Sequence, residues 1–197
     1  MIEGPAGAQW LVLGLGNPGE EYVGTRHNVG FEVVDALCRR HGIVLRQRLP
    51  SLLYGQGRIV GQEVILGKPR TFMNRSGVAA REGLKRWMLR PEQLLVVLDD
   101  VALPLGKIRV RKQGSDGGHK GLRSVLASVG SELVPRIRVG IGQPKHGDIV
   151  EFVLSPFSRA ERPVIDEAIE RAADAVETVL SQGVEVAMNR FNARSAS

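Results

Sequence analysis

The sequence is poor in cysteine, in aromatic residues and in long apolar runs, and each shortage excludes a class of protein. Its single cysteine, Cys38, excludes an internal disulfide and is typical of a reducing cytoplasm. Cys38 lies among the apolar positions of a predicted helix, so we interpret it as a packing residue rather than a nucleophile. Aromatic residues make up 5% of the chain, and we do not expect stacked rings to be its main means of binding nucleobases. No apolar stretch approaches the ~20 residues that span a bilayer, and residues 1–5 lack the features of a signal peptide. We therefore expect a cytoplasmic protein.

The charge balance is positive, with a net charge of +6 and an isoelectric point of about 10.0. A basic surface attracts polyanions, because contacts with phosphates release condensed counterions. Many soluble proteins of unrelated function are also basic, so charge alone leaves nucleic-acid binding open.

Short apolar runs alternate with segments in which apolar residues return at helical spacing, as in residues 31–37. This alternation predicts an α/β protein, which we expect to be a single-domain three-layer α/β/α sandwich around a mixed, mostly parallel sheet. The domain is expected to span residues 10–192, between a flexible leader at 1–9 and a flexible tail at 193–197. Residues 54–68, with Gly61 near their middle, predict an antiparallel hairpin. Strands are predicted at 10–15, 54–59, 63–68, 94–98, 107–111 and 137–141, and helices at 29–41, 76–87, 121–129 and 160–182.

The most informative segment follows the first predicted strand, where a glycine-rich loop leads to His27. Loops on a rigid scaffold commonly carry catalytic groups, and histidine takes up and releases protons near neutral pH. Residues 14–19 also satisfy the G-x-G-x-x-G pattern of dinucleotide-binding proteins. That pattern requires a helix that opens at the third glycine, whereas Gly24 and Gly30 interrupt any such helix here. A dinucleotide-dependent oxidoreductase is therefore the weaker interpretation.

Further polar or glycine-rich runs stand at the ends of predicted elements, where α/β sheets gather their ligands. In chain order the motifs are GLGNPG, TRHNVGF, TFMNRSG, LDD followed by LPLG, GGHKG, RVGIG and FVLSPFS. In this order and at these separations, the sequence resembles bacterial peptidyl-tRNA hydrolase from about Trp10 to Asn192. The resemblance implies a metal-independent monomeric enzyme, without cofactors, that hydrolyses the ester between a peptide and the 3′ ribose of tRNA and so releases tRNA for reuse.

The resemblance implies that His27 is the base that takes a proton from water, and that Asp99 orients it. A carboxylate that accepts a hydrogen bond from an imidazole fixes its tautomer and stabilises the imidazolium that forms. The residues alone leave two alternatives open. His27 could simply cap the following helix, and Asp100 is the neighbouring candidate for the carboxylate.

The resemblance also implies that Asn17 and Asn74 bind substrate, since an amide can hold peptide backbone, the ribose or a developing oxyanion. Tyr22 and Phe72 match positions in the pocket wall. Ordinary turn chemistry for Asn17 and core packing for the two aromatic residues are the alternatives.

One position departs from the family pattern. The glycine loop often reads GGHNG in the family, whereas this chain has Lys120 in place of the asparagine. Lysine donates hydrogen bonds but cannot accept them, and it adds a charge suited to a phosphate. Lys120 is therefore predicted either to bind the 3′ end as a donor or to point to solvent.

Arginines on two predicted strands match positions that grip the 5′-phosphate of tRNA in the family. They are Arg111 and Arg138, and Arg109 extends the patch. The planar guanidinium suits phosphate oxygens, although a solvated strand face is the commoner explanation of such a pattern. A clamp of this kind would read phosphate and backbone rather than nucleotide sequence.

A binding protein on the same fold is the remaining alternative, because relatives of this hydrolase serve as RNA-splicing factors in plant organelles. Fold does not fix function, so the site must decide. The presence of His27, Asp99, Asn17 and Asn74 favours catalysis.

Overall fold

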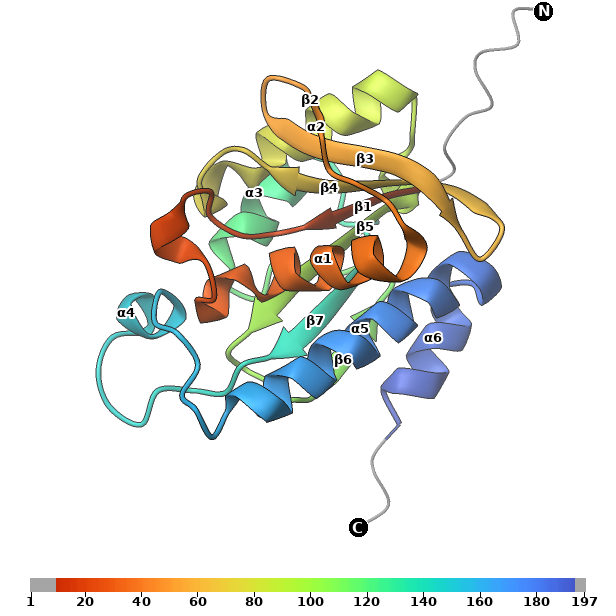
Figure 1. Ribbon diagram of the computed structural model, residues 1–197. Coiled ribbons are helices and arrows are strands. Elements are labelled where there is room, and N and C mark those ends of the chain that lie inside the picture. Colours follow the sequence, from red (N-terminus) through yellow and green to blue (C-terminus); the bar gives the residue numbers. More distant parts are fainter. Residues whose placement is uncertain (1–9, 194–197) are drawn as a thin grey trace, which may run out of the picture.

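The computed structural model describes residues 10–193, so the leader predicted at 1–9 and residues 194–197 of the predicted tail lie outside the described residues. The described chain forms a seven-stranded sheet in the order β2-β3-β4-β1-β5-β7-β6, with helices on both faces (Figure 1). None of these helices is long and apolar enough to cross a membrane. The strands are β1 (Trp10–Gly14), β2 (Gln47–Arg48), β3 (Leu52–Ile59), β4 (Gln62–Pro69), β5 (Leu94–Asp100), β6 (Ile108–Arg111) and β7 (Arg136–Gly140).

The centre of the sheet is parallel and its edges are antiparallel. Strands β4, β1, β5 and β7 are parallel neighbours, with Val12 of β1 between Leu66 of β4 and Leu95 of β5. Strands β3 and β4 form the predicted hairpin, and β6 runs antiparallel to β7 at the other edge. The expected mixed sheet with a parallel core is confirmed.

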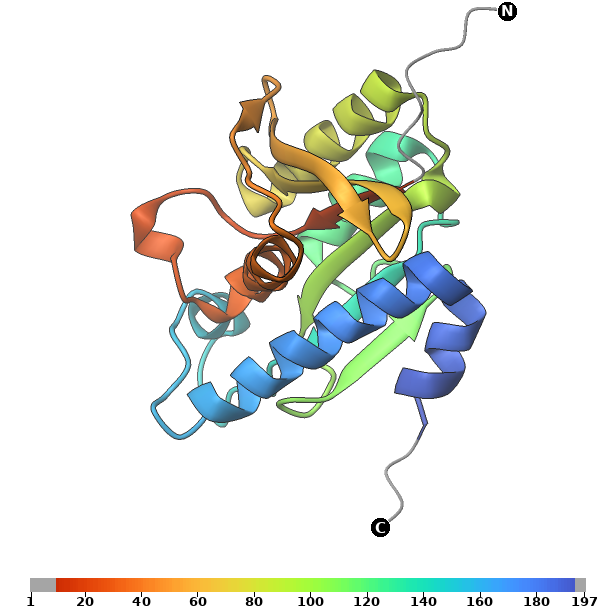
Figure 2. The same cartoon turned by 45° about the vertical axis from the view of Figure 1, so that its right-hand side comes forward.

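Helices cover both faces of the sheet, which explains the almost continuous apolar character of β1 and β5. In β1, Leu11 and Leu13 pack into the cluster under α2 and α3, whereas Val12 packs into the cluster under α1, α5 and α6. Figure 2 shows α1 and α5 on one side of the sheet and α2 and α3 on the other. The helices are α1 (Val29–His41), α2 (Ser76–Trp87), α3 (Lys120–Val129), α4 (Ile149–Val153), α5 (Arg162–Gln182) and α6 (Val184–Phe191).

The structure adds elements that periodicity did not predict. Strand β2 is two exposed residues long and depends on pairing with β3, and α4 spans barely more than one turn. Helix α6 follows α5 directly, separated only by Gly183 with its positive φ of 93°. Within residues 10–193 there are also four 3-10 helices: η1 (Glu20–Tyr22), η2 (Arg26–Asn28), η3 (Met73–Arg75) and η4 (Pro91–Gln93).

The edge strand β6 is covered by a side chain from the end of α6. The amide of Asn192 accepts a hydrogen bond from Val110 N at 2.8 Å and donates one to Val110 O at 2.8 Å. Both backbone groups of a central residue of this edge strand are thereby satisfied within the chain.

The parallel strands bring the predicted catalytic residues and the predicted asparagines to one end of the sheet. The loops after β1 and β4 and the last residues of β5 all lie at the carboxyl ends of neighbouring parallel strands. Helix α1 begins directly against these strand ends, because Gly30 has no side chain to separate them. A Cβ built on Gly30 would meet the carbonyl oxygen of Val97 and lie 2.6 Å from that of Leu15.

We predict that Gly30→Ala destabilises the fold, because two backbone carbonyls cannot move aside for a methyl group. The expected loss is roughly 1–3 kcal/mol of the free energy of unfolding, the usual cost of overpacking a core. Gly83→Ala is the matched control, since a Cβ there meets the side chains of Leu11 and Trp87, which can turn. Urea titrations should show the larger midpoint shift for Gly30→Ala, and equal shifts would contradict this account.

Candidate active site

His27 and Asp99 meet at the carboxyl end of the sheet. His27 belongs to η2, immediately before α1, and Asp99 is the penultimate residue of β5. His27 Nδ1 lies 2.8 Å from Asp99 Oδ2. The carboxylate is buried, whereas 14% of the imidazole is exposed. The bond identifies Asp99, not Asp100, as the partner of His27, and the imidazole makes no side-chain cap to α1.

A second histidine, which the sequence did not single out, holds the other oxygen of Asp99. His119 Nε2 lies 2.8 Å from Asp99 Oδ1, and the rings of His119 and His27 are 5.2 Å apart. His119 also caps α3, where its Nδ1 accepts a hydrogen bond from Leu122 N. Because Nδ1 accepts, Nε2 must carry the proton that is donated to Asp99. The sequence feature that could have indicated a role for His119 is its position in a glycine loop directly before a predicted helix.

Asp99 is held in its ionised form. Burial of its carboxyl opposes ionisation, but the two imidazoles and their hydrogen bonds outweigh burial and lower the pKa of Asp99 well below its usual range. An ionised carboxylate has no proton to donate, so both ring nitrogens that face it are donors. In neutral His27, the proton therefore sits on Nδ1 and the lone pair on Nε2.

Asn17 is fixed by two other segments. Its Oδ1 accepts a hydrogen bond from Met73 N at 2.7 Å. Its backbone is held by the side chain of Asn28, which accepts from Asn17 N at 2.8 Å and donates to Asn17 O at 3.0 Å. Within residues 10–193 no hydrogen bond engages Asn17 Nδ2, so this donor remains for an acceptor in the pocket that Asn17 lines. Asn17 is therefore held by residues far away in the sequence, and not only by hydrogen bonds within its own turn, which was the alternative left open by the sequence.

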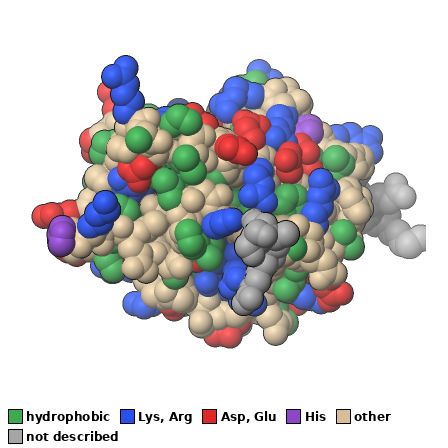
Figure 3. Space-filling view, turned by 90° about the horizontal axis from the view of Figure 1, so that it is seen from below, with side chains coloured by type: hydrophobic (Ala, Val, Ile, Leu, Met, Phe, Trp, Pro, Cys, Tyr) green, Lys and Arg blue, Asp and Glu red, His purple; other side chains and the backbone are tan. Residues whose placement is uncertain are grey.

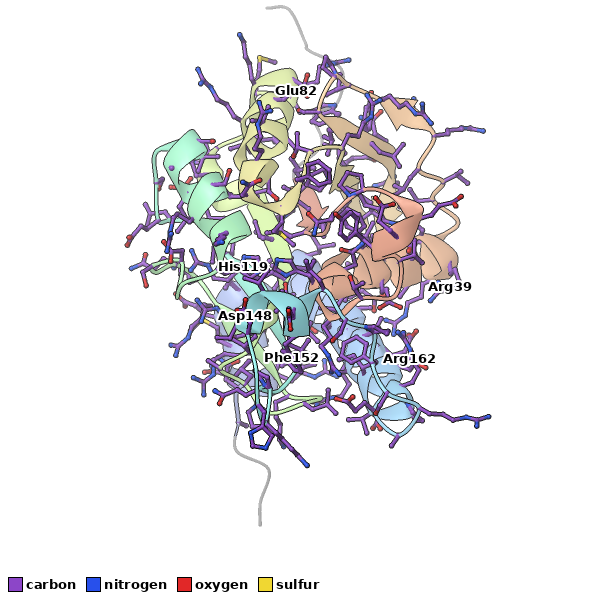
Figure 4. All side chains as sticks on the ribbon, turned by 90° about the vertical axis from the view of Figure 1, so that its left-hand side faces the viewer. Arg39, Glu82, His119, Asp148, Phe152 and Arg162 are labelled. Carbon is purple, nitrogen blue, oxygen red and sulfur yellow. The ribbon has the colours of Figure 1, made fainter. Side chains whose placement is uncertain are left out.

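These side chains line a cavity of about 560 Å³. Its floor is polar, with His27, Asp99 and His119, and one wall is apolar and belongs to α4. Figure 4 shows His119 on the same side of the molecule as Asp148, which caps the start of α4, and Phe152, which lies within α4. The remaining residues that line the cavity are Asn17, Phe72, Met73, Asn74, Leu98, Asp100, Val101, Asp116, Gly117, Gly118, Lys120, Arg138, Ile149, Val150, Val153 and Leu154.

The cavity includes some of the predicted substrate residues and leaves out others. Phe72, Asn74 and Lys120 line it, and all three are exposed. Tyr22 does not line it but packs edge-on against Phe72, with ring centroids 6.2 Å apart. Tyr22 therefore supports the rim rather than forming the wall that the sequence predicted.

The arginines of β6 and β7 share one face of the sheet but have different surroundings. Arg138 lines the cavity, 3.5 Å from Asp100, and its buried Nε has no partner in the described chain. Arg109 and Arg111 are exposed and lie opposite Arg138 and Arg136, outside the cavity lining. Only Arg138 of the three predicted phosphate contacts reaches the cavity itself.

Arg136 supports the glycine loop instead of facing solvent. It is fully buried, and its guanidinium donates to the carbonyls of Val134, Ser115 and Gly114 at 2.8–3.0 Å. Burial and the nearby charge of Arg138 lower the pKa of Arg136 to about 10. The loop that presents His119 is thereby fixed from beneath.

The trio of His27, Asp99 and His119 also resembles a set of metal ligands, since their donor atoms lie within 4.8 Å of one another. A metal ion needs an unprotonated ring nitrogen. The Nε2 of His119 is protonated as long as its Nδ1 caps α3, so binding a metal would break that cap. The geometry suits a hydrogen-bonded trio better than a metal centre.

The residue before His27 anchors the loop to the start of α5. Arg26 is buried and forms two hydrogen bonds with Glu161, at 2.8 and 2.9 Å. This pairing, opposed by partial burial, lowers the pKa of Glu161 to about 2.

The chain matches known proteins over nearly its whole length. A family model described as peptidyl-tRNA hydrolase matches residues 11–197. The peptidyl-tRNA hydrolase of Caldanaerobacter subterraneus subsp. tengcongensis is 51% identical, over 93% of this chain and 99% of its own. That of Carboxydothermus hydrogenoformans is 47% identical, over 93% and 98%. A crystal structure of peptidyl-tRNA hydrolase from Acinetobacter baumannii has a TM-score of 0.88 and 36% identity, covering 98% of this chain and 99% of that one. Uridine phosphorylase from Vibrio fischeri, at 12% identity and a TM-score of 0.54, shares the fold alone.

We predict that the stabilising effect of Glu161 depends on pH. Its pKa is about 2 in the folded chain against an ordinary 4.5, so its contribution is complete above about pH 4.5 and is lost as the pH falls towards 2. Glu161→Gln should therefore lower the thermal midpoint at pH 7, and the difference from the parent should shrink steadily below pH 4.5. Glu167→Gln, an exposed change in α5, the helix that Glu161 precedes, is the control and should show no such trend. A difference that grows on acidification would refute the prediction.

Proposed function

Since the chain belongs to the peptidyl-tRNA hydrolase family, we propose that His27 is the general base of this hydrolysis and that Asp99 orients it. The observation that carries the proposal is the 2.8 Å bond between His27 Nδ1 and the buried Asp99 carboxylate, beside a cavity that both residues line. The bond places the proton on Nδ1 and leaves Nε2 as the basic atom.

The proposed reaction begins when Nε2 of neutral His27 removes a proton from a water molecule in the cavity. The resulting hydroxide attacks the ester carbonyl between the peptide and the 3′ ribose. The ionised Asp99 stabilises the imidazolium, as the carboxylate of a serine-protease triad does. The tetrahedral intermediate then expels the ribose oxygen, which takes up the proton from His27, so the products are free tRNA and a peptide with a new carboxyl group.

Asn17 is the proposed donor to the oxyanion. Its Oδ1 is occupied by Met73 N, which fixes the amide so that Nδ2 is the free group. A fixed donor stabilises developing charge without reorganisation during the reaction. Asn74 and Phe72, both exposed at the rim, are proposed to hold the peptide or the terminal ribose, with Tyr22 supporting Phe72.

His119 is a positioning residue in this mechanism. It donates to the second oxygen of Asp99, which leaves the carboxylate only one orientation towards His27. A ligated or rotated Asp99 could not hold the His27 tautomer, so we do not propose a metal in the reaction.

Arg138, Arg109 and Arg111 are proposed to bind the 5′-phosphate of the substrate. They lie on one face of β6 and β7, and the buried Nε of Arg138 has no partner among the described residues. Figure 3 shows the molecule from below, where basic and acidic side chains are interspersed. The proposal therefore depends on these particular arginines rather than on net charge. Lys120, exposed at the cavity and outside the ion pairs of the described chain, is proposed as a donor to the 3′ end.

A purely RNA-binding role is the second candidate, and no observation favours it. A binding module has no need of an imidazole bonded to a buried carboxylate beside a cavity. A monomeric state and a cytoplasmic location remain predictions.

We predict that His27→Ala lowers kcat for release of the acyl group from N-blocked aminoacyl-tRNA by about 10²- to 10⁴-fold, the usual contribution of a general base. Binding of tRNA should be largely unchanged. His41→Ala is the control, because His41 pairs with Glu177 outside the cavity. Activity of the parent should also persist in a metal chelator. Normal turnover by His27→Ala, or loss of activity with the chelator, would overturn the mechanism.

We predict that Arg138→Ala raises KM by roughly 10- to 100-fold for substrates with a 5′-phosphate, the range expected for one lost hydrogen bond to a charged group. The same substrate without that phosphate should be cleaved almost equally by the parent and the variant. Arg171→Ala, an exposed change on α5, controls for the loss of one charge. Equal effects of Arg138→Ala on both substrates would refute a phosphate contact.

A further inference from the structure

The short helix α4 forms one wall of the cavity and is joined to the core by Val153 and Phe152. Its residues Val150 and Val153, with Leu154 just beyond, line the cavity. Figure 1 shows α4 at the margin of the molecule, away from the sheet. Among the described elements it packs chiefly against η2, the turn that contains His27. The contacts between α4 and η2 therefore determine where this wall stands.

Arg26 of η2 contacts α4 through Phe152 and binds the segment that follows α4. Its guanidinium forms two hydrogen bonds with Glu161 and a third, at 3.2 Å, with Ser155 Oγ. Its backbone N–H donates to Ser155 O at 3.0 Å. The segment that follows α4 is thus bound to this side chain, and its Pro156 also pairs with Thr25, the residue before Arg26.

Two aromatic rings complete the surroundings of Arg26. The guanidinium carbon lies 4.3 Å from the ring centroid of Phe152, which is in α4, and 5.0 Å from that of Phe157. Arginine stacks on aromatic faces while its edge binds a carboxylate, which lysine cannot do with the same geometry. A buried charge is tolerated only when it is fully paired, so the arrangement has little freedom to shift.

We propose that Arg26 is a positioning residue that sets the distance between the α4 wall and the catalytic loop. His27 is its immediate neighbour in η2, so one short turn fixes both the imidazole and the apolar wall facing it. Arg26 acts through α4 and touches none of the reacting atoms. The expected changes in KM and kcat rest on the function proposed above.

The test is Arg26→Lys, which keeps the charge but loses the planar fork. We expect KM for peptidyl-tRNA to rise about 10-fold, while kcat changes less than 3-fold and its pH profile stays the same, because the bond between His27 and Asp99 is untouched. Amide hydrogen exchange in residues 149–154 should be faster than in the parent. Glu161→Gln, which leaves the aromatic contacts in place, should change KM and exchange in the same direction and serves if Arg26→Lys does not fold.

Arg40→Lys is the matched control. Arg40 of α1 binds three carboxylates on α5, those of Glu170, Asp174 and Glu177, outside the cavity. It should lower the thermal midpoint without changing KM or exchange in residues 149–154.

Three outcomes would overturn the proposal. Equal KM changes in Arg26→Lys and Arg40→Lys would reduce Arg26 to a general stabilising role. A shifted pH profile of kcat would mean that Arg26 acts on His27 directly. Unchanged exchange in residues 149–154 would show that Arg26 does not hold α4. The exchange measurement needs no turnover, so it still decides the role of Arg26 if the parent protein fails to cleave peptidyl-tRNA and the proposed function is lost.

Discussion

The buried carboxylate of Asp99 joins three parts of the chain that are far apart in sequence. It is the penultimate residue of β5, it bonds the imidazole that precedes α1, and it bonds the imidazole that caps α3. An ionised carboxylate this deeply buried is stable only because both of its oxygens accept charge-assisted hydrogen bonds. The folding of the two loops and the chemistry of the cavity therefore depend on the same group. A change at any of the three residues affects both.

Two arginines that stand two positions apart on β7 have different roles. Arg136 and Arg138 lie on the same face of β7, yet Arg136 is sealed under a loop while Arg138 opens on the cavity. The difference comes from the glycine loop before α3, whose carbonyl groups cover Arg136. One arginine thus holds the loop in place, and the next is left available to a ligand. Charge counted along the sequence cannot separate these two roles.

Much of the fold and the centre of the site could be predicted from the sequence, because they depend on local pattern. Apolar periodicity predicted the bounds of α1 and α2, whereas His27 and Asp99 were indicated by short motifs together with the family resemblance that these motifs carry. His119 and Asn28 were missed, since their roles consist of bonds to residues 20 and 11 positions away that no local pattern encodes. Helix α4 was missed because five residues are too few to show a period, and Tyr22 was misplaced because adjacency to the loop does not tell which ring faces the cavity.

The side chain of Asn192 pairs with the backbone of β6, the outer strand of the sheet, on the side where no further strand follows. A side-chain amide has an acceptor oxygen and a donor NH2 group in the same plane, and so imitates one residue of a neighbouring strand. With that imitation in place at Val110, the margin of the sheet offers no continuous template on which a second molecule could add its own strand. A residue just beyond the last helix thereby occupies the pairing groups of Val110, on the same strand that carries Arg109 and Arg111.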